Sequence, residues 1–236
     1  MSLPAANLLR SQVEARIPSA FATYRRPELK TILTGISPID DLHGGVPIGA
    51  LTEICGSNIA SSGKTSLLVS LLANASQEHF CALVDASDAF DPAPADATGM
   101  NLSRLLWVRC GKNKSKLKPL EQAFKVADIL LQSGGFGLII VDLGSIAERL
   151  VRGIPLSSWF RFSRVVEKQS TALVFIEQQP HATSCAGLVF RMTTDAATFS
   201  GRVITKLNLE AEVVRAREKK PMQSARELFS LKTLWA

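Results

Sequence analysis

The chain has 236 residues, of which 46% are hydrophobic and 20% are charged, and its formal net charge is +6. This composition excludes a wholly disordered or collagen-like chain, and no apolar run approaches the ~18 residues that a membrane-spanning helix requires. The modest positive charge fits a polyanionic partner but does not identify one. The first ten residues lack the basic start and long apolar centre of a signal peptide, so we expect a cytoplasmic protein with no membrane partner.

The N-terminal segment predicts a helix over residues 3–16, with Leu8, Leu9 and Val13 roughly on one face. About a dozen helical residues are marginally stable alone in water, so this apolar face needs a surface to cover it. Two interpretations remain open. The helix either packs on its own core or docks on a neighbouring subunit.

Residues 18–30 contain prolines and show no periodicity, so they are expected to form a linker. We therefore expect two regions in the chain. Residues 1–29 form the N-terminal helix and its linker, and residues 30–236 form one nucleotide-binding core domain.

Apolar strands alternate with helices through most of this core. The expected strands span residues 50–55, 80–85, 105–109, 137–142 and 172–176, and the expected helices span residues 64–75, 117–132 and 157–168. Because the strands are apolar throughout, they predict an α/β fold with a mostly parallel, twisted sheet and helices on both faces. After residue 203, short apolar runs alternate with charge, as in strands at a sheet edge.

A glycine- and serine-rich segment, GSNIASSGKTS, lies between the first of these strands and a helix. In such a loop, main-chain N–H groups and the helix N-terminus hold nucleotide phosphates, a lysine reaches the outer phosphates and a threonine ligates magnesium. The usual glycine five residues before the Gly-Lys pair is Asn58 here, and asparagine tolerates positive φ well enough to fill that role. The alternative is a turn in which Gly-Lys-Thr occurs by chance. The predicted binding residues for ATP or ADP are Gly56, Asn58, Ser61, Ser62, Gly63, Lys64, Thr65 and Ser66.

A carboxylate at the end of a later apolar strand supports the same interpretation. Residues 138–142, LIIVD, end in Asp142. In phosphate-loop proteins such an aspartate lies beside the magnesium ion. A carboxylate there is also a common helix or turn cap, so it carries weight only together with Lys64 and Thr65. We predict that Thr65 and Asp142 hold Mg²⁺.

Several segments, in the same order along the chain, resemble the RecA family of recombinase ATPases. Residues 34–40, TGISPID, and residues 45–56 resemble the family's entry into its phosphate loop, and residues 84–92 resemble its next strand and turn. The resemblance covers roughly residue 30 to the C-terminus. It implies a RecA-like P-loop NTPase core preceded by an N-terminal helix.

The resemblance also implies roles for residues outside the phosphate loop. Gln178 matches the glutamine that senses the γ-phosphate, and Asp91 matches an adenine contact. Arg215 and Arg217 lie in the segment that carries two lysines toward the nucleotide of the next subunit. In that position, arginine can stabilise the charge on a transferring phosphate. These residues are the candidate catalytic and base-contacting groups.

Several departures from the family pattern weaken the expectation of catalysis and strand exchange. Ser87 stands where the family has its catalytic glutamate, and serine is a poor general base for water. Asp85 and Asp88 are close, but a shift of one or two positions redirects a side chain. Pro94 stands where a tyrosine stacks on adenine, and both DNA-binding loops are short. We therefore expect weak or absent ATP hydrolysis and no strand exchange.

Within the family, the chain most resembles the ImuA proteins of bacterial mutagenesis cassettes, in its compact size and in the sequence of residues 8–14, 26–27 and 47–53. This resemblance implies a part in the DNA-damage (SOS) response that supports error-prone translesion synthesis. The implied partners are a second copy or a Y-family polymerase-like protein and RecA, with single-stranded DNA as a further candidate. Two alternatives remain: a competent DNA-dependent ATPase of the recombinase type, and a non-catalytic adaptor with a vestigial nucleotide site.

Other features have an ordinary interpretation beside a functional one. Residues 112–118 hold four lysines that could follow a phosphate backbone, but such a run is more often a solvated loop. Trp159 lies where the family has its first DNA loop, yet packing beneath a helix is the simpler interpretation. The histidines share no spacing, so we expect no metal or catalytic histidine.

Overall fold

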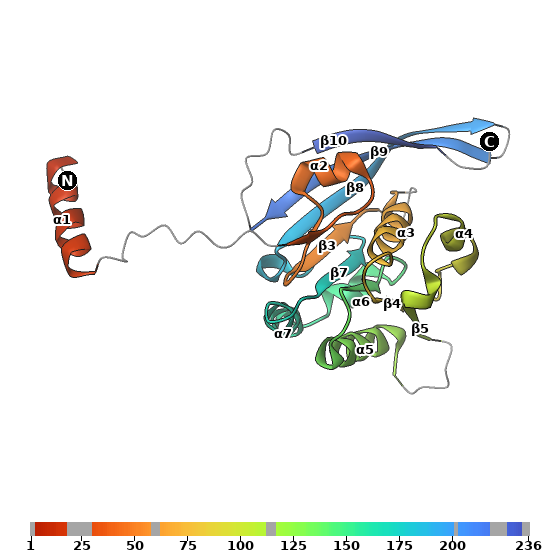
Figure 1. Ribbon diagram of the computed structural model, residues 1–236, viewed down its shortest axis with the longest axis horizontal. Helices are drawn as coiled ribbons and strands as arrows, with labels where there is room; N and C mark the ends of the chain where they lie inside the picture. The colour runs from red at the N-terminus through yellow and green to blue at the C-terminus, as the bar shows by residue number, and fades with distance from the viewer. Residues whose placement is uncertain are drawn as a thin grey trace.

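The fold is built on one mixed sheet of eight strands in a computed structural model that describes residues 3–17, 30–57, 62–111, 117–200, 203–217 and 226–232 (Figure 1). The strands are β3 (Leu51–Cys55), β4 (Cys81–Asp85), β5 (Leu105–Arg109), β6 (Leu138–Asp142), β7 (Ala172–Glu177), β8 (Leu188–Ser200), β9 (Val203–Ala216) and β10 (Arg226–Lys232). Their order across the sheet is β10-β9-β8-β3-β7-β6-β4-β5. The six strands from β8 to β5 are parallel, and at one edge β9 pairs antiparallel with β8 and β10 pairs antiparallel with β9. The predicted α/β fold with a mostly parallel sheet is confirmed.

Helices cover both faces of the sheet (Figure 1). One face carries α2 (Ser37–His43), α3 (Lys64–Ala75) and α4 (Pro92–Ala97), and the other carries α5 (Pro119–Ser133), α6 (Glu148–Arg152) and α7 (Leu156–Val166). A two-residue ladder joins β1 (Thr31–Ile32) to β2 (Val46–Pro47). Because both faces are buried, the central strands are continuous apolar runs, and neighbouring side chains of one strand enter different cores. Val174 and Ile176 of β7 face α3, whereas Leu173 and Phe175 face α5 and α7.

An aromatic cluster fixes α7 and α5 on their face of the sheet. Trp159 is buried, and its ring centroid lies 4.8 Å from that of Phe175 in an edge-to-face arrangement. Phe124 of α5 contacts the same two rings and Phe162. The packing interpretation of Trp159 is therefore correct, whereas Phe160, the next residue, is exposed.

The strand register brings the carboxyl ends of β3, β7, β6 and β4 to one edge of the sheet. Cys55 of β3 lies opposite Glu177 of β7, Ile176 lies opposite Asp142 of β6, and Asp142 lies opposite Asp85 of β4. In open parallel sheets, ligand sites form outside the carboxyl ends of strands. The segments that follow these four strands carry the predicted site.

Two of the sequence-based expectations differ from the structure. The strand predicted over 80–85 begins at Cys81, and Phe80 is exposed rather than buried. The sequence analysis did not predict the 13-residue strand β8, which forms a long antiparallel pair with β9. The remaining predicted helices and strands appear within about two residues of their expected ends.

The N-terminal helix α1 spans Leu3–Arg16, as the sequence predicts. Leu9, Val13 and Ile17 are exposed, whereas the side chain of Leu8 and the linker residues 18–29 lie outside the described part of the chain. In the described segments, helices are too short or too polar to cross a membrane.

Candidate functional site

The phosphate-loop segment leads from β3 into the first turn of α3. Gly63 adopts a left-handed conformation with φ of 78°, and α3 begins at Lys64. Gly56 has no room for a side chain, because a Cβ there would lie 2.8 Å from the main-chain oxygen of Met192 and 2.7 Å from the hydroxyl of Ser62. The loop therefore turns close to β8. Asn58 and Ser61, two of the predicted binding residues, lie outside the described residues.

Lys64 is buried at the start of α3 and points back across the loop. Its Nζ donates to the main-chain oxygens of Gly56 at 2.6 Å and Glu177 at 3.0 Å. Burial lowers the pKa of Lys64, and the neighbouring Asp142 opposes that shift. The ammonium group thus lies between the phosphate loop and the end of β7, where it can reach an incoming phosphate.

A cavity of about 90 Å³ joins the predicted phosphate and metal residues. Lys64 and Thr65 from α3, Asp142 from the end of β6, and Gly144 line it together with Phe90 and other residues. Burial raises the pKa of Asp142 to about 6, while the N–H of Gly144, 2.8 Å from its Oδ1, opposes the shift. A Cβ on Gly144 would lie 3.0 Å from that oxygen and 3.8 Å from Lys64 Nζ.

This donor set fits a magnesium–nucleotide group. Main-chain N–H groups at the start of a helix and a lysine suit phosphate oxygens, and a hydroxyl with a carboxylate suits Mg²⁺. Thr65 and Ser66 are exposed in the first turn of α3, and Ser62 is buried just before it. The structure brings these residues to one place. Their binding of a nucleotide stays a prediction.

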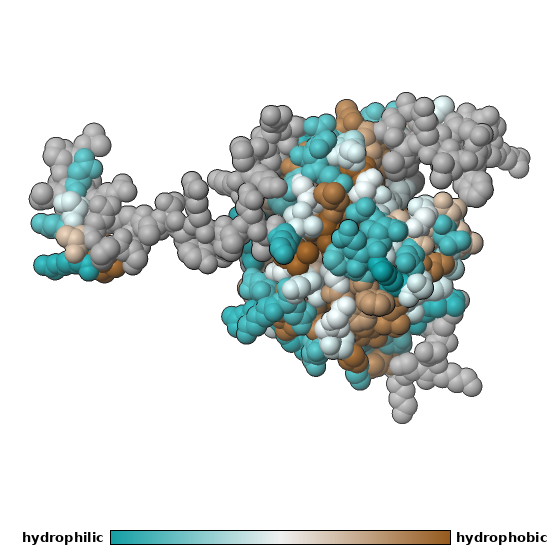
Figure 2. All heavy atoms as spheres, in the orientation of Figure 1, coloured by the Kyte–Doolittle hydropathy of each residue, from teal (hydrophilic) through white to brown (hydrophobic). Residues whose placement is uncertain are grey.

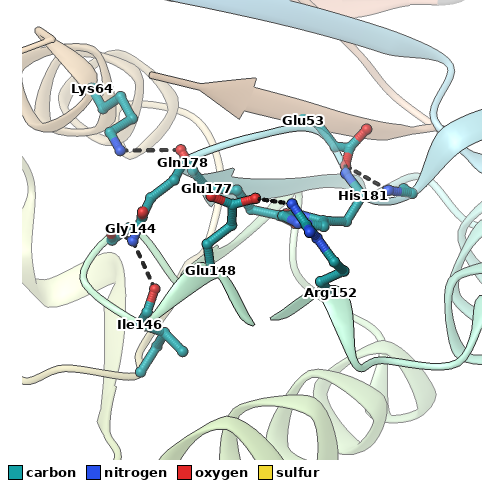
Figure 3. Close-up of polar contacts among 10 residues, drawn as sticks. Glu53, Lys64, Gly144, Ile146, Glu148, Arg152, Glu177, Gln178 and His181 are labelled. Carbon is teal, nitrogen blue, oxygen red and sulfur yellow. Dashed lines mark hydrogen bonds and ion pairs between the residues drawn. The ribbon is translucent and has the colours of Figure 1, made fainter. Parts of the chain in front are cut away.

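Gln178 links the end of β7 to the loop that follows β6 (Figure 3). Its Nε2 donates to the main-chain oxygen of Ile146 at 2.8 Å and, more weakly, to that of Gly144 at 3.3 Å. Gly144 also donates to Asp142. A movement of the Asp142 carboxylate would therefore reach Gln178 through Gly144.

Asp85 and Asp88 hold the loop at Ser87 in place through hydrogen bonds. Asp85 is buried and accepts the N–H groups of Ala89 at 3.1 Å and Phe90 at 2.9 Å, as well as that of Ser87 at 3.1 Å. The indole of Trp107 also approaches Asp85, at 3.4 Å. These four donors occupy the oxygens of Asp85, so its carboxylate is not available as a base.

Asp88 is likewise engaged. It has a positive φ of 56°, and both its oxygens pair with Arg109, whose guanidinium lies over the ring of Trp107. Ser87 itself is exposed. The described carboxylates on either side of Ser87 therefore have structural roles.

Asp91 caps the N-terminus of α4, since its carboxylate accepts the N–H of Ala93 at 3.0 Å. Asp91 and Pro94 are both exposed. The predicted contact of Asp91 with a nucleobase stays a prediction.

Arg215 and Arg217 bind their own chain in this structure. Arg215 donates to the main-chain oxygen of Thr183, and Arg217 donates to that of Ser184 at 2.8 Å. Arg217 also pairs with Glu167 at 3.0 Å. Both guanidinium groups lie at the end of β9, beside the segment that follows β7.

The sequence analysis missed a polar cluster buried beneath this segment. Glu53 of β3 and Glu177 of β7 are fully buried, and Glu177 Oε2 lies 2.6 Å from Nδ1 of His181. The available signal was a carboxylate within β3 and another at the end of β7, in strands whose other residues are mostly apolar. The expectation of no metal or catalytic histidine rested on the spacing between histidines alone, and it is not contradicted by this cluster.

The chain is similar in sequence to RecA proteins. The model of the RecA N-terminal domain matches residues 21–152. Protein RecA of Rickettsia bellii is 38% identical over 118 residues, which is 49% of this chain and 32% of that protein. Protein RecA of Desulfotalea psychrophila is 33% identical over 150 residues, covering 57% and 40%. Protein RecA of Ectopseudomonas oleovorans is 39% identical over 121 residues, covering 50% and 32%. The chain thus spans a third to two fifths of these relatives.

Proposed function

Because this chain belongs to the RecA N-terminal domain family, we propose that it binds ATP or ADP together with Mg²⁺ at the carboxyl edge of its sheet. The observation that carries the proposal is the convergence of Lys64, Thr65 and Asp142 on one cavity at the ends of β3 and β6. Thr65 and Asp142 would hold the magnesium ion, which neutralises charge on the outer phosphates when bound. The remaining nucleotide contacts of the proposal are Gly56, Asn58, Ser61, Ser62, Gly63, Ser66 and Asp91.

In this proposal, each residue acts by position and charge. The N–H groups of the first turn of α3 bind the phosphates, and Lys64 turns from its two carbonyl partners toward the outermost one. Gln178 senses that phosphate from the end of β7. Its bond to Ile146 then transmits a change to the loop after β6.

Hydrolysis in this proposal is weak or absent. A water molecule attacking the γ-phosphate needs a positioned base or orienting group, and Ser87 supplies no carboxylate. Asp85 and Asp88 cannot replace it without breaking the bonds that shape their own loop. A competent ATPase, the first alternative, would need a base from elsewhere.

We further propose that the chain acts through partners, in the manner of the ImuA proteins. Its part would be in the SOS response, supporting translesion synthesis with a Y-family polymerase-like protein and RecA, and without strand exchange. The short connections support the absence of strand exchange, since a five-residue helix, α6, occupies much of the link between β6 and α7. Only residues 178–187 separate β7 from β8.

Self-association is part of the same proposal. Phe80, Leu106 and Ile129 are exposed on the α5 side of the outer strand β5, and Figure 2 shows apolar residues among polar ones over this region. Leu9 and Val13 of α1 are exposed as well. Burial of these side chains between copies would remove apolar surface from water. Residues 1–29 would then serve as a docking arm separate from the core domain of residues 30–236.

One experiment separates the alternatives. Nucleotide binding and phosphate release are measured on the same preparation, with and without single-stranded DNA. Binding with negligible release supports the proposal. Release at ordinary turnover of ~1–1000 per second identifies a competent ATPase. Absence of binding at millimolar nucleotide leaves the non-catalytic adaptor.

A further inference from the structure

Two glutamates, Glu53 in the middle of β3 and Glu177 at the end of β7, are buried outside the nucleotide cavity. Both are fully buried, and both lie on the sheet face covered by α5 and α7. The cavity opens on the other face, where Ile176 lines it. Burying a carboxylate costs several kcal/mol unless it is paired and hydrogen-bonded, so these side chains need a structural reason.

Their hydrogen bonds all lead to one short segment. Glu53 Oε1 accepts the main-chain N–H of His181 at 2.6 Å and that of Ala182 at 2.7 Å. Glu177 Oε2 lies 2.6 Å from His181 Nδ1 (Figure 3). One residue, His181, is therefore held by its main chain from β3 and by its ring from β7.

The other oxygen of each glutamate has no hydrogen-bond partner among the described residues. A buried acceptor without a donor carries its full desolvation cost. The hydrogen bonds that compensate the burial of these two side chains therefore all run to residues 181–182.

The next residues along the chain hold the two arginines. Thr183 to Cys185 form a 3₁₀ turn, η2, in which Thr183 has a positive φ of 47°. Main-chain oxygens of this turn accept from Arg215 and Arg217. The turn is thus fixed on one side by buried glutamates and on the other side provides the acceptors that orient both guanidinium groups.

We propose that Glu53, Glu177 and His181 form a buried latch that positions the turn at residues 183–185 and, through it, Arg215 and Arg217. The latch residues are positioning residues, because none of them lines the cavity and only the main-chain oxygen of Glu177 touches a group that does, Lys64. The inference rests on the proposed function in one respect, since only a partner nucleotide gives the orientation of the arginines a consequence.

The electrostatics add a pH dependence to the latch. Burial raises the pKa of Glu53 and raises that of Glu177 to about 7, and the bond to Glu177 raises the pKa of His181. The cluster therefore holds a proton near neutral pH and loses it as the pH rises. The charged or titratable groups that face it from the packed elements are Cys55 of β3, Lys64 of α3, Glu148 of α6, Cys185 of η2 and Arg215 of β9.

Hydrogen exchange tests the first half of the proposal. In Glu53→Ala, the amides of His181 and Ala182 should exchange about tenfold faster than in the wild type, because each loses a buried acceptor. Asp40→Ala is the matched control, since Asp40 accepts the N–H groups of Thr34 and Gly35 at a distant turn. That variant should speed exchange at its own turn and leave residues 181–185 unchanged.

Arginine modification tests the second half without any nucleotide. Phenylglyoxal, followed by peptide mapping, should modify Arg215 and Arg217 several-fold faster in Glu53→Ala and in His181→Ala than in the wild type. Glu177→Gln preserves shape and should lower the pKa of His181, read by NMR, even if the alanine variants fold poorly. Glu53→Gln keeps one acceptor oxygen and should restore part of the protection.

The outcomes are separable from those of the nucleotide experiment. Faster exchange at 181–182 with unchanged arginine modification would show that the latch does not position the arginines. Unchanged exchange, or a His181 pKa insensitive to Glu177→Gln, would remove the latch itself. Either result stands whether or not the chain binds ATP.

Discussion

The ammonium group of Lys64 lies 3.0 Å from the main-chain oxygen of Glu177, the last residue of β7, and this contact joins the phosphate loop to the strand that Gln178 follows. The same ammonium also binds the oxygen of Gly56 at 2.6 Å. A phosphate that attracts Lys64 therefore weakens its hydrogen bond to Glu177 of β7. We expect nucleotide binding to change the hydrogen bonding at the end of β7 first.

The first prediction concerns hydrolysis. Ser87→Glu should raise phosphate release above the wild-type rate, since a carboxylate then stands at the position where the family has its base. General-base assistance contributes typically ~10²–10⁴-fold, and a gain within or below this range is expected, because Asp85 and Asp88 fix the loop for a smaller residue. Phosphate release under saturating nucleotide measures the effect. Ser87→Gln, which has similar size but cannot take a proton, is the control and should show no gain.

The second prediction concerns Gly144. Gly144→Ala should weaken magnesium-dependent nucleotide binding, because its Cβ would lie 3.0 Å from Asp142 Oδ1 and displace that carboxylate. Titration with nucleotide at several magnesium concentrations measures the change. Gly99→Ala is the comparison variant, because a Cβ there meets no atom within 4 Å, although its φ of 82° costs backbone strain. An equal loss in both variants would mean that Gly144 has no special place beside the metal.

The third prediction concerns pH and stability. Glu177 and Asp142 have pKa values raised by burial, to about 7 and about 6, and the pKa of His181 is also raised. The folded protein therefore retains protons that the unfolded chain has released, so the free energy of unfolding falls as pH rises from about 5 to 8. Each such proton contributes a slope of at most about 1.4 kcal/mol per pH unit.

Urea denaturation at several pH values measures this slope, and Glu177→Gln should flatten it. If Glu177 did not titrate in this window, the free energy of unfolding would change with pH equally in the wild type and in the variant. Stability that increased from pH 5 to 8 in the wild type would contradict the assigned direction of all three shifts.

The fourth prediction concerns the aromatic cluster. Trp159→Ala should lower the free energy of unfolding by about 3–5 kcal/mol, because it removes a buried ring packed on Phe124 and Phe175. Denaturant unfolding measures the loss. Phe160→Ala, at an exposed position beside it, should cost much less. Similar costs at both positions would place Trp159 outside the core.

The central sheet could be predicted because each element carries a strong local signal. The helix over 64–75 and the strand over 105–109 match α3 and β5 in both bounds. Uninterrupted apolar strands between amphipathic helices leave few arrangements other than a covered parallel sheet. The approach of Lys64 to Asp142 follows from the same topology, since the helix that follows β3 and the end of β6 meet at the carboxyl edge of the sheet, with β7 between the two strands.

The features that could not be predicted depend on distant contacts. β8 contains the polar run Thr193 to Asp195, and its strand conformation depends on pairing with β9. Glu53 and His181 are 128 residues apart, so no spacing rule connects them. The bonds of Arg215 and Arg217 to the turn at 183–185 likewise exist only in the folded chain.

The most direct test of the account is magnesium-dependent nucleotide binding by the wild type and Lys64→Ala, followed as a shift in melting temperature. Binding at a hundred times the dissociation constant stabilises a protein by about 2.7 kcal/mol, which corresponds to several degrees for a chain of this size. We predict this shift with ATP or ADP in the wild type and in Lys125→Ala, an exposed lysine on α5, and its loss in Lys64→Ala. An equal shift in Lys64→Ala, or none in the wild type at millimolar nucleotide, would contradict the proposed site.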